Sequence, residues 1–273
     1  GVDKAAGDYV VILDSDVVLP PGYIESVSEE LNREPADAFG GPDKAHSSFT
    51  DTQKAISYSM TSFFTTGGIR GSKKKKLDKF YPRSFNMGVK RNVYEKLGGF
   101  SKMRFGEDID FSIRIFKAGC RCRLFPDSWV WHKRRTDFRK FFRQVYNSGI
   151  ARINLYKKYP ESLKLVHLLP MVFTVGVIFL VLLSAVGRIL MHYDDIHRWY
   201  WLCAGPWLPI IAYCLLIFID STRQNRSMKI GAMSIAAAFV QLMGYGCGFL
   251  SAWWKRCVMG KNEFSAFDKT FYK

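Results

Sequence analysis

The chain has 273 residues, of which 48% are hydrophobic and 23% are charged, and its 40 Lys and Arg against 24 Asp and Glu give a formal net charge of +16. This composition excludes a disordered or low-complexity protein, because such chains lack the apolar residues needed for a folded core. The length allows one or two domains. Residues 1–164 are polar and patterned like a globular domain, whereas long apolar runs begin at Leu165.

The first recognisable element is a strand over Asp8–Leu13, and the residues before it read as the end of a helix without an initiator Met. The strand is apolar almost throughout, which is typical of strands buried on both faces of a parallel sheet. A central strand of this kind needs neighbours on both sides. We therefore expect the natural protein to have an N-terminal portion that precedes this sequence.

Helical and strand-like segments alternate from there to residue 132. Pro20 opens a helix with an apolar face formed by Tyr23, Ile24, Val27 and Leu31. Further helices are predicted over 51–64 and 107–118, strands over 38–41, 80–90, 121–125 and 128–132, and a flexible basic loop over 67–76. The alternation predicts an α/β domain.

Residues 137–158 form a long predicted helix whose apolar side chains gather on one side. Across 130–164, ten Lys and Arg outweigh two acidic residues and give a net charge of +8. A basic amphipathic helix beside a long apolar run is typical of a helix that lies on an anionic membrane surface. The alternative is ordinary packing against the preceding domain.

Three runs without a charged residue follow, over 165–187, 199–219 and 230–254. Each has about the 20 residues needed to cross a bilayer, so the sequence predicts a membrane protein rather than three buried core helices. Six cysteines are present, and the pair Cys120 and Cys122 is too closely spaced for an ordinary disulfide. A reducing compartment is the simplest interpretation.

The charges beside these runs predict the topology only in part. Lys and Arg mark the cytoplasmic side of a membrane, which places the +8 segment there. Three complete spans would put the tail 255–273, with a net charge of +3, on the outer side. A break at Gly244–Gly248 would instead make the last helix a re-entrant hairpin and keep the tail inside.

Two aspartates, Asp14 and Asp16, follow directly after the first strand. In open α/β sheets, ligands bind beyond the carboxyl ends of the strands. Carboxylates at i and i+2 in a tight loop can reach one hard cation, Mg²⁺ or Mn²⁺, which usually also holds substrate phosphates. The alternative is a turn with solvated aspartates.

Two further groups of residues could carry chemistry. Glu107, Asp108 and Asp110 open a helix, where they either cap free N–H groups or supply a general base for an acceptor hydroxyl. His132 ends a predicted strand and could complete a metal site, and the cations at 133–135 could neutralise a leaving diphosphate.

Taken in order, these residues resemble family 2 glycosyltransferases, which have the GT-A nucleotide-sugar fold. The similarity covers about 150 residues, and its motifs are 5–16, Phe85–Gly88, Leu97–Phe100, Gly106–Asp110, Gly119, Arg143–Gln144 and Gly149–Arg152. The family's first half, which holds the base and ribose of the nucleotide, has no counterpart in this sequence. The resemblance therefore implies a GT-A-like, Rossmann-like nucleotide-sugar domain without its N-terminal part, followed by transmembrane helices.

The resemblance also implies a role for each matching residue. Asp14, Asp16 and His132 correspond to the metal and diphosphate site, Asp108 to the base, and Glu107 to a neighbour that shapes the acceptor pocket. Asn86, Arg143, Gln144 and Arg152 are expected to contact substrate. The stretch from Arg143 departs from the Gln-x-x-Arg-Trp motif of processive members because it has no Trp, which argues against processive polymer synthesis.

We therefore expect a partial GT-A catalytic domain over 1–136, a basic interfacial helix over 137–164, about three transmembrane helices over 165–254 and a basic tail over 255–273. The expected function is that of an inverting, metal-dependent hexosyltransferase at the cytoplasmic face of the membrane. Its partners would be a UDP- or GDP-sugar, a glycan or lipid-linked acceptor and membrane lipids, without nucleic acid. The alternative is a non-enzymatic basic membrane protein that binds anionic lipid or nucleic acid.

Overall fold

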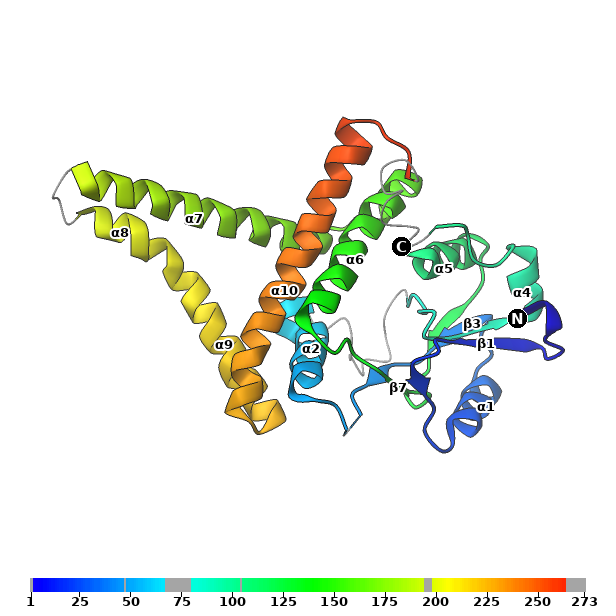
Figure 1. Ribbon diagram of the computed structural model, residues 1–273. Helices are drawn as coiled ribbons and strands as arrows, with labels where there is room; N and C mark the ends of the chain where they lie inside the picture. The colour runs from blue at the N-terminus through cyan, green and yellow to red at the C-terminus, as the bar shows by residue number, and fades with distance from the viewer. Residues whose placement is uncertain (1, 47, 67–79, 104, 194–197, 264–273) are drawn as a thin grey trace. The chain divides into compact units, whose positions relative to one another are not determined.

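The computed structural model describes residues 2–46, 48–66, 80–103, 105–193 and 198–263 (Figure 1). The chain forms two compact units, Gly1–Phe49 with Gly67–Arg134, and Thr50–Thr66 with Arg135–Lys273. The division after Arg134 lies close to the boundary expected at 136. Thr50–Thr66, which the sequence analysis placed in the first domain, groups with the second unit. The basic loop expected over 67–76 and most of the tail lie outside the described residues.

The first unit is built on two small sheets. The four-stranded sheet has the order β1 (Tyr9–Leu13), β5 (Asn86–Lys90), β3 (Ala38–Gly40) and β6 (Cys122–Leu124), and the three-stranded sheet has the order β2 (Val17–Val18), β7 (Val130–His132) and β4 (Asp43–Lys44). Pairs β1–β5, β3–β5 and β2–β7 are antiparallel, and β3–β6 and β4–β7 are parallel. The α/β class is therefore confirmed, with mixed sheets.

Two predicted strands differ from the structure. β1 lies at the end of its sheet, so among the described residues it pairs on one side only, whereas the sequence predicted a central strand. The strand expected over 80–90 begins only at Asn86, because Arg83 and Asn86 form an isolated bridge that turns the chain just before β5.

The helices of the first unit are η1 (Val2–Lys4), α1 (Tyr23–Arg33), α4 (Arg91–Lys96) and α5 (Glu107–Lys117). α5 ends as predicted, since Gly119 adopts the left-handed conformation at φ +74° that favours glycine. In α1, Tyr23 and Val27 are buried, but Ile24 is 63% exposed and does not share the buried face.

The core of the first unit centres on Phe39 of β3, whose ring stacks on Phe125 at 4.5 Å between centroids. Gly88 of β5 makes room for this ring, because a Cβ at that position would lie 2.0 Å from it. Tyr9 and Val11 of β1 and Val130 of β7 pack in the same cluster, so both strands that lead to Asp14 and His132 are anchored in this core.

The second unit is helical. Its elements are α2 (Asp51–Thr61), α3 (Phe63–Thr66), α6 (Phe138–Lys158), η2 (Pro160–Ser162), η3 (Leu165–His167), α7 (Leu169–Tyr193), α8 (Arg198–Ala204), η4 (Gly205–Trp207), α9 (Leu208–Asn225), α10 (Met228–Trp253) and the π-helical turn η5 (Trp254–Val258). The helix expected over 51–64 is interrupted at Ser62, and Phe63 beyond the interruption is 73% exposed.

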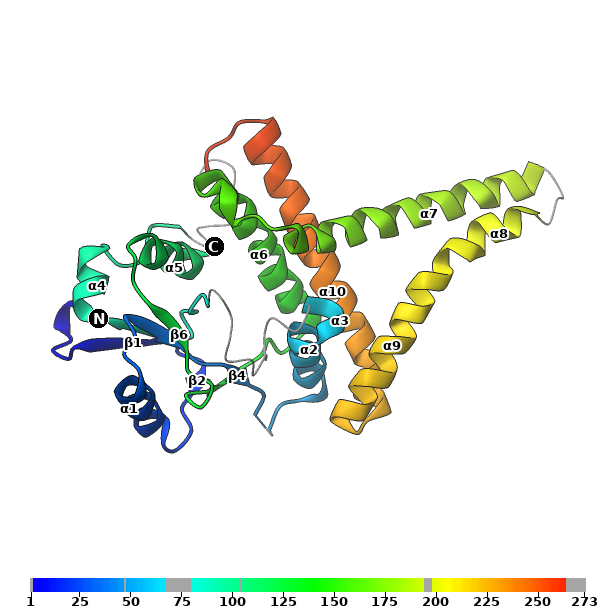
Figure 2. The same cartoon turned by 180° about the vertical axis from the view of Figure 1, so that it is seen from behind.

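Three helical segments are long and apolar enough to cross a membrane: Leu165–His192, Gly205–Asn225 and Met228–Val258. They correspond to the three apolar runs of the sequence. Within the second unit, α7 projects away from α10 and α9 returns to it (Figures 1 and 2).

The break at Gly244–Gly248, considered as the alternative to three complete spans, does not occur, because α10 is continuous from Met228 to Trp253. These glycines serve close packing between helices instead. A Cβ at Gly248 would lie 2.0 Å from the carbonyl oxygen of Tyr146, and a Cβ at Gly149 would lie 2.2 Å from that of Tyr245. The small residues let the backbones of α6 and α10 approach directly.

Candidate functional site

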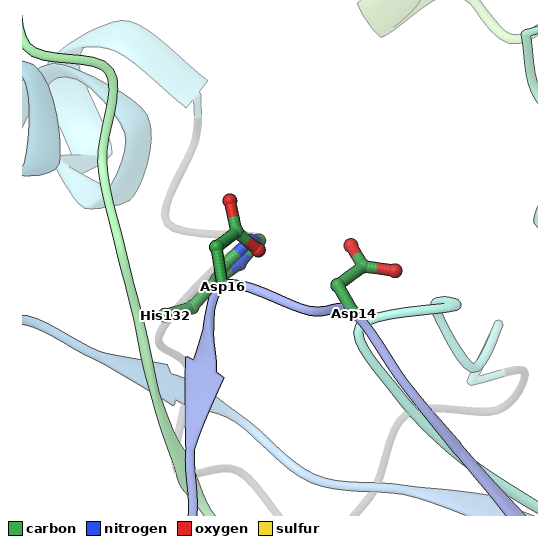
Figure 3. A group of neighbouring side chains, drawn as sticks. All are labelled: Asp14, Asp16 and His132. Carbon is green, nitrogen blue, oxygen red and sulfur yellow. The ribbon is translucent and has the colours of Figure 1, made fainter.

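Asp14, Asp16 and His132 come together in the first unit (Figure 3). One ligand atom from each lies within 4.8 Å of the other two. Asp14 follows β1 and Asp16 precedes β2, and the register of β2 with β7 pairs Val17 with His132. The chain therefore brings His132 Nε2 to 3.3 Å from Asp16 Oδ1, although more than 110 residues separate them in sequence.

Neighbouring side chains hold the His132 ring. Phe85 stacks on it at 4.8 Å between centroids, and Asp43 Oδ2 lies 3.7 Å from its Nδ1. Asp43 also accepts a hydrogen bond of 2.5 Å from Arg134 Nη1, and both of these side chains are buried. Sequence reasoning missed Asp43, because a lone Asp in a two-residue strand has no informative spacing.

The same contact changes the interpretation of the cations at 133–135. The Arg134 side chain is only 3% exposed and pairs with Asp43, so it stabilises the support of His132. Lys133 is exposed, as expected for a residue that could meet a diphosphate. The run 133–135, which the sequence analysis treated as one group of cations, thus has one buried, paired member, Arg134, and two exposed members.

The donor set fits a divalent cation. Two carboxylates and an imidazole suit Mn²⁺ and, through their oxygens, Mg²⁺. The Nδ1 atom of His132 is buried and has no hydrogen-bond partner within the described residues, and Asp43 Oδ2, 3.7 Å away, could orient the ring. Asp14 and Asp16 are exposed and therefore accessible to a ligand.

The two acidic motifs belong to one electrostatic site. Burial raises the pKa of Asp14, and the charges of Asp16 and Asp108 raise it further, while His132 lowers it. Burial also raises the pKa of Glu107, with Asp108 and Asp14 adding to the effect and Arg83 opposing it. A site with this excess of negative charge favours a bound cation.

Asp108 lies at the start of α5 with both oxygens engaged. Oδ1 accepts a hydrogen bond of 2.8 Å from the Ile109 N–H, and Oδ2 accepts one of 3.2 Å from Arg83 Nη1. Ser112, one helical turn later, donates to the carbonyl oxygen of Pro82 at 3.1 Å. The segment Pro82–Arg83 therefore follows one face of α5, and sequence reasoning missed Arg83 because that segment is irregular.

Asp110 has a different role from its neighbours. It is completely buried and pairs with Arg114 Nε at 3.0 Å. Arg114 also donates to the carbonyl oxygens of Leu97 and Gly99, at 2.6 Å and 2.5 Å. Gly99 adopts φ +62°. This network fixes the Leu97–Phe100 turn against α5, so Asp110 is structural.

Asn86 was expected to contact substrate, but its surroundings indicate a structural role. Its side chain is 1% exposed, accepts a hydrogen bond of 2.6 Å from Tyr23 and donates one of 2.8 Å to the Ser128 carbonyl. A Cβ at Gly41 would lie 2.7 Å from its amide nitrogen and 1.8 Å from the Ser128 carbonyl oxygen. Asn86 thus ties α1 and the segment before β7 to β5.

The other three expected substrate residues lie on α6 in the second unit. Arg143 is exposed, and Gln144 and Arg152 are half-buried. Their contact with substrate stays a prediction.

Comparison with known proteins provides the family. Residues 9–219 match the family model described as "Glycosyl transferase family group 2". The chain is 30% identical over 59 residues to a probable glycosyltransferase, YdaM, of Bacillus subtilis, a match that covers 22% of this chain and 14% of that protein. It is 24% identical over 188 residues to the pre-mycofactocin glycosyltransferase of Mycobacterium tuberculosis, which covers 68% of this chain and 39% of that protein.

The chain therefore spans less than half the length of the relatives that it matches. The family model nevertheless covers more than half of this chain, from the strand before Asp14 to the second apolar run. Mixed α/β sheets, clustered carboxylates and three helices that could cross a membrane agree with this match. The chain belongs to glycosyl transferase family group 2.

Proposed function

We propose that this protein is an inverting glycosyltransferase that moves a sugar from a nucleotide-diphosphate sugar to a hydroxyl acceptor at a membrane. The observation that carries the proposal is the convergence of Asp14, Asp16 and His132 with the carboxylates that open α5 in one electrostatic site. Phosphate binding and proton abstraction need such groups side by side.

Asp14, Asp16 and His132 would hold Mg²⁺ or Mn²⁺, with Asp43 orienting the histidine. When bound, the cation would supply counter-charge for the diphosphate of the donor. Lys133, exposed beside His132, would add a further positive charge. This assignment leaves Arg134 to hold Asp43 in place.

Asp108 would accept the proton of the acceptor hydroxyl. Its two hydrogen bonds, from the Ile109 N–H and Arg83, fix the plane of the carboxylate. Glu107 lies beside it and would shape the acceptor site. The deprotonated oxygen would then attack the anomeric carbon from the side opposite the leaving diphosphate, which inverts the configuration at that carbon.

The proposed donor is a UDP- or GDP-sugar and the proposed acceptor a glycan or a lipid-linked hydroxyl. One similar protein is named a pre-mycofactocin glycosyltransferase. The missing Trp after Arg143 agrees with transfer of a single sugar. The charge of +8 over residues 130–164 supports a cytoplasmic position for the site.

The test combines metal binding and turnover. Mn²⁺ binding by the purified protein is measured first without substrate, and turnover is then screened by mass spectrometry over UDP- and GDP-sugars. Asp16→Ala should lose both, because one of three ligands and its charge are removed. Asp127→Ala, which removes an exposed carboxylate outside the cluster, is the matched control and should keep both. Full turnover in EDTA after replacement of Asp14 and Asp16 would refute the metal role.

A further inference from the structure

The helix α10 differs from the other two possible spans in what surrounds it. In the most apolar windows of the first two segments, 11% of the residues are buried by protein, whereas 44% are buried in Met228–Val258. Much of this burial comes from α6. Ile150 and Ile153 of α6 form one cluster with Phe249 and Ala252 of α10. α6 therefore runs along the C-terminal half of α10 in direct contact.

The charges of α6 conflict with a transmembrane α10. Arg139, Lys140 and Arg143 are exposed on α6. α6 contacts α10 at Val145 and Gly149, through Gly244 and Gly248. If α10 crossed the hydrocarbon core, these cations would lie at the same depth and face lipid. A Lys or Arg at the centre of a span costs about 2.5–3.5 kcal/mol.

The contacts of α7 and α9 point to a different orientation. The first turns of α7 meet α10 near Gly246, where a Cβ would lie 2.1 Å from Thr174 Oγ1. The last turns of α9 meet α10 near Gly231, where a Cβ would lie 2.1 Å from Thr222 Oγ1. The hydroxyls of Ser221 and Ser234 are also 2.7 Å apart.

The depth of these two contact points in the membrane determines the direction of α10. If α7 crosses the membrane and α9 crosses back, the start of α7 and the end of α9 lie at the same face and at similar depth. Gly231 and Gly246 are 15 residues apart, which is about 22 Å along a helix at 1.5 Å per residue. α10 connects these points and therefore runs along that face. Figure 1 shows α7 leaving α10 sideways near its middle and α9 ending at its N-terminal end.

From Ala232 onward, the side of α10 opposite α6 carries apolar residues, of which Phe239 also contacts Phe173 of α7. Its residues recur at helical spacing, and we name them the apolar stripe: Ala232, Ala236, Phe239, Met243, Cys247, Leu250 and Trp254. Ala232, Ala236 and Trp254 are exposed, and the others are half-buried. Trp254 is followed by Lys255 and Arg256, and aromatic and basic residues together are typical of the membrane–water interface.

We propose that α10 lies in the plane of the membrane on the side of the first unit, with the apolar stripe against the acyl chains and α6 on its other side. Helices α7 and α9 are then the crossing pair, and the partner of the apolar stripe is the lipid bilayer. A helix with one apolar face, opposite a layer of basic residues, is the arrangement of interfacial helices.

The proposal also accounts for the positions of the basic segments, because three complete spans would put the basic residues after α10 on the side opposite the other basic segments. The Lys229 ammonium pairs with Asp51 at 2.8 Å, and Tyr58 donates to Asp220 at 2.7 Å. α2 is connected in sequence to the first unit at both ends, so the turn between α9 and α10 lies on that side. An in-plane α10 brings residues 255–263 to the same side. The basic segments 130–164, at +8, and 220–229, at +2, then share one face with 255–263, at +2.

The experiment locates the end of the chain by two independent readouts. First, green fluorescent protein or alkaline phosphatase is fused after Lys273 of the full chain in a bacterial host; the former fluoresces only when it folds inside, the latter is active only outside. Second, single cysteines are labelled with a membrane-impermeant maleimide in a background without the six native cysteines. Asn262→Cys reports the tail, Lys102→Cys the first unit and His192→Cys the far turn; all three positions are exposed.

The expected result is a fluorescent fusion without phosphatase activity, and labelling of Asn262→Cys from the same side as Lys102→Cys. An active phosphatase fusion, or labelling of Asn262→Cys together with His192→Cys, would show that α10 crosses the membrane and overturn the proposal. If the cysteine variant is unreactive from both sides, the fusion pair still decides. Both readouts are independent of sugar transfer, so they do not depend on the proposed function.

Discussion

Replacing Gly248 by Ala tests whether α6 and α10 are held together by direct backbone contact. The added Cβ would lie 2.0 Å from the Tyr146 carbonyl oxygen, whereas an ordinary contact begins at 3.4 Å, so the two helices would have to separate by up to 3.4 − 2.0 = 1.4 Å. The clashing atom belongs to the backbone, so it cannot rotate away as a side-chain atom could. Overpacking of this kind costs about 1–3 kcal/mol, and the gain in helix propensity returns at most about 1 kcal/mol.

We therefore expect Gly248→Ala to lower the free energy of unfolding by about 1–2 kcal/mol, or the unfolding temperature by about 2–8 °C. The assay is thermal unfolding in detergent at a fixed scan rate, followed by tryptophan fluorescence. Gly176→Ala on α7 is the matched control, because nothing lies within 4 Å of its Cβ, and it should be neutral or slightly stabilising. Equal stability of the two variants would refute the packing argument.

Three other predictions follow from the first unit. Asp108→Asn should lower kcat about 10²–10⁴-fold without lowering the unfolding temperature. Asp110→Asn breaks a buried pair with Arg114 and should lower the free energy of unfolding in denaturant by about 3 kcal/mol. The reverse pattern would show that Asp108 is not the base. Asn86→Ala should cost about 2–4 kcal/mol because Tyr23 and Ser128 both lose a partner, and unchanged stability would contradict its structural role. Hydrogen bonds from the Arg121 N–H and Lys90 lower the pKa of Asp37 in the folded state, so the ionised carboxylate stabilises the fold fully above the unfolded pKa of 3.8, and this contribution disappears as the pH falls through the lower folded pKa. Asp37→Asn should therefore lower the free energy of unfolding more at pH 7 than at pH 3. An equal decrease at both pH values would contradict this linkage.

The parts of the fold that local pattern determines could be predicted from sequence. The strand before Asp14, the helix that ends before Gly119 and the basic helix from 138 to 158 all have clear periodicity or end signals. The acidic motifs could also be recognised, because Asp14, Asp16 and Asp108 stand at the ends of secondary-structure elements. These features depend on neighbours in sequence.

The remaining features depend on partners that are distant in sequence. Arg83 meets Asp108 and Asp43 meets His132 only because separate strands and helices are packed together. The glycines at 244 and 248 resemble a helix break in sequence, and only the carbonyl of Tyr146 reveals that they fit a neighbour. The hydrogen bonds of Asn86 could not be predicted for the same reason, since its buried partners Tyr23 and Ser128 are 63 and 42 residues away.

The path of the chain between the two units has a practical consequence for producing the first unit in soluble form. The chain passes between the units after Phe49, after Thr66 and after Arg134. Truncation at Arg134 would keep α2 but remove the helices that cover it, and Ala55, Ile56 and Met60, now buried with Phe141 and Ile230, would face water. A soluble version should therefore also replace residues 50–66 with a short polar linker, because otherwise an orphaned apolar helix would promote aggregation.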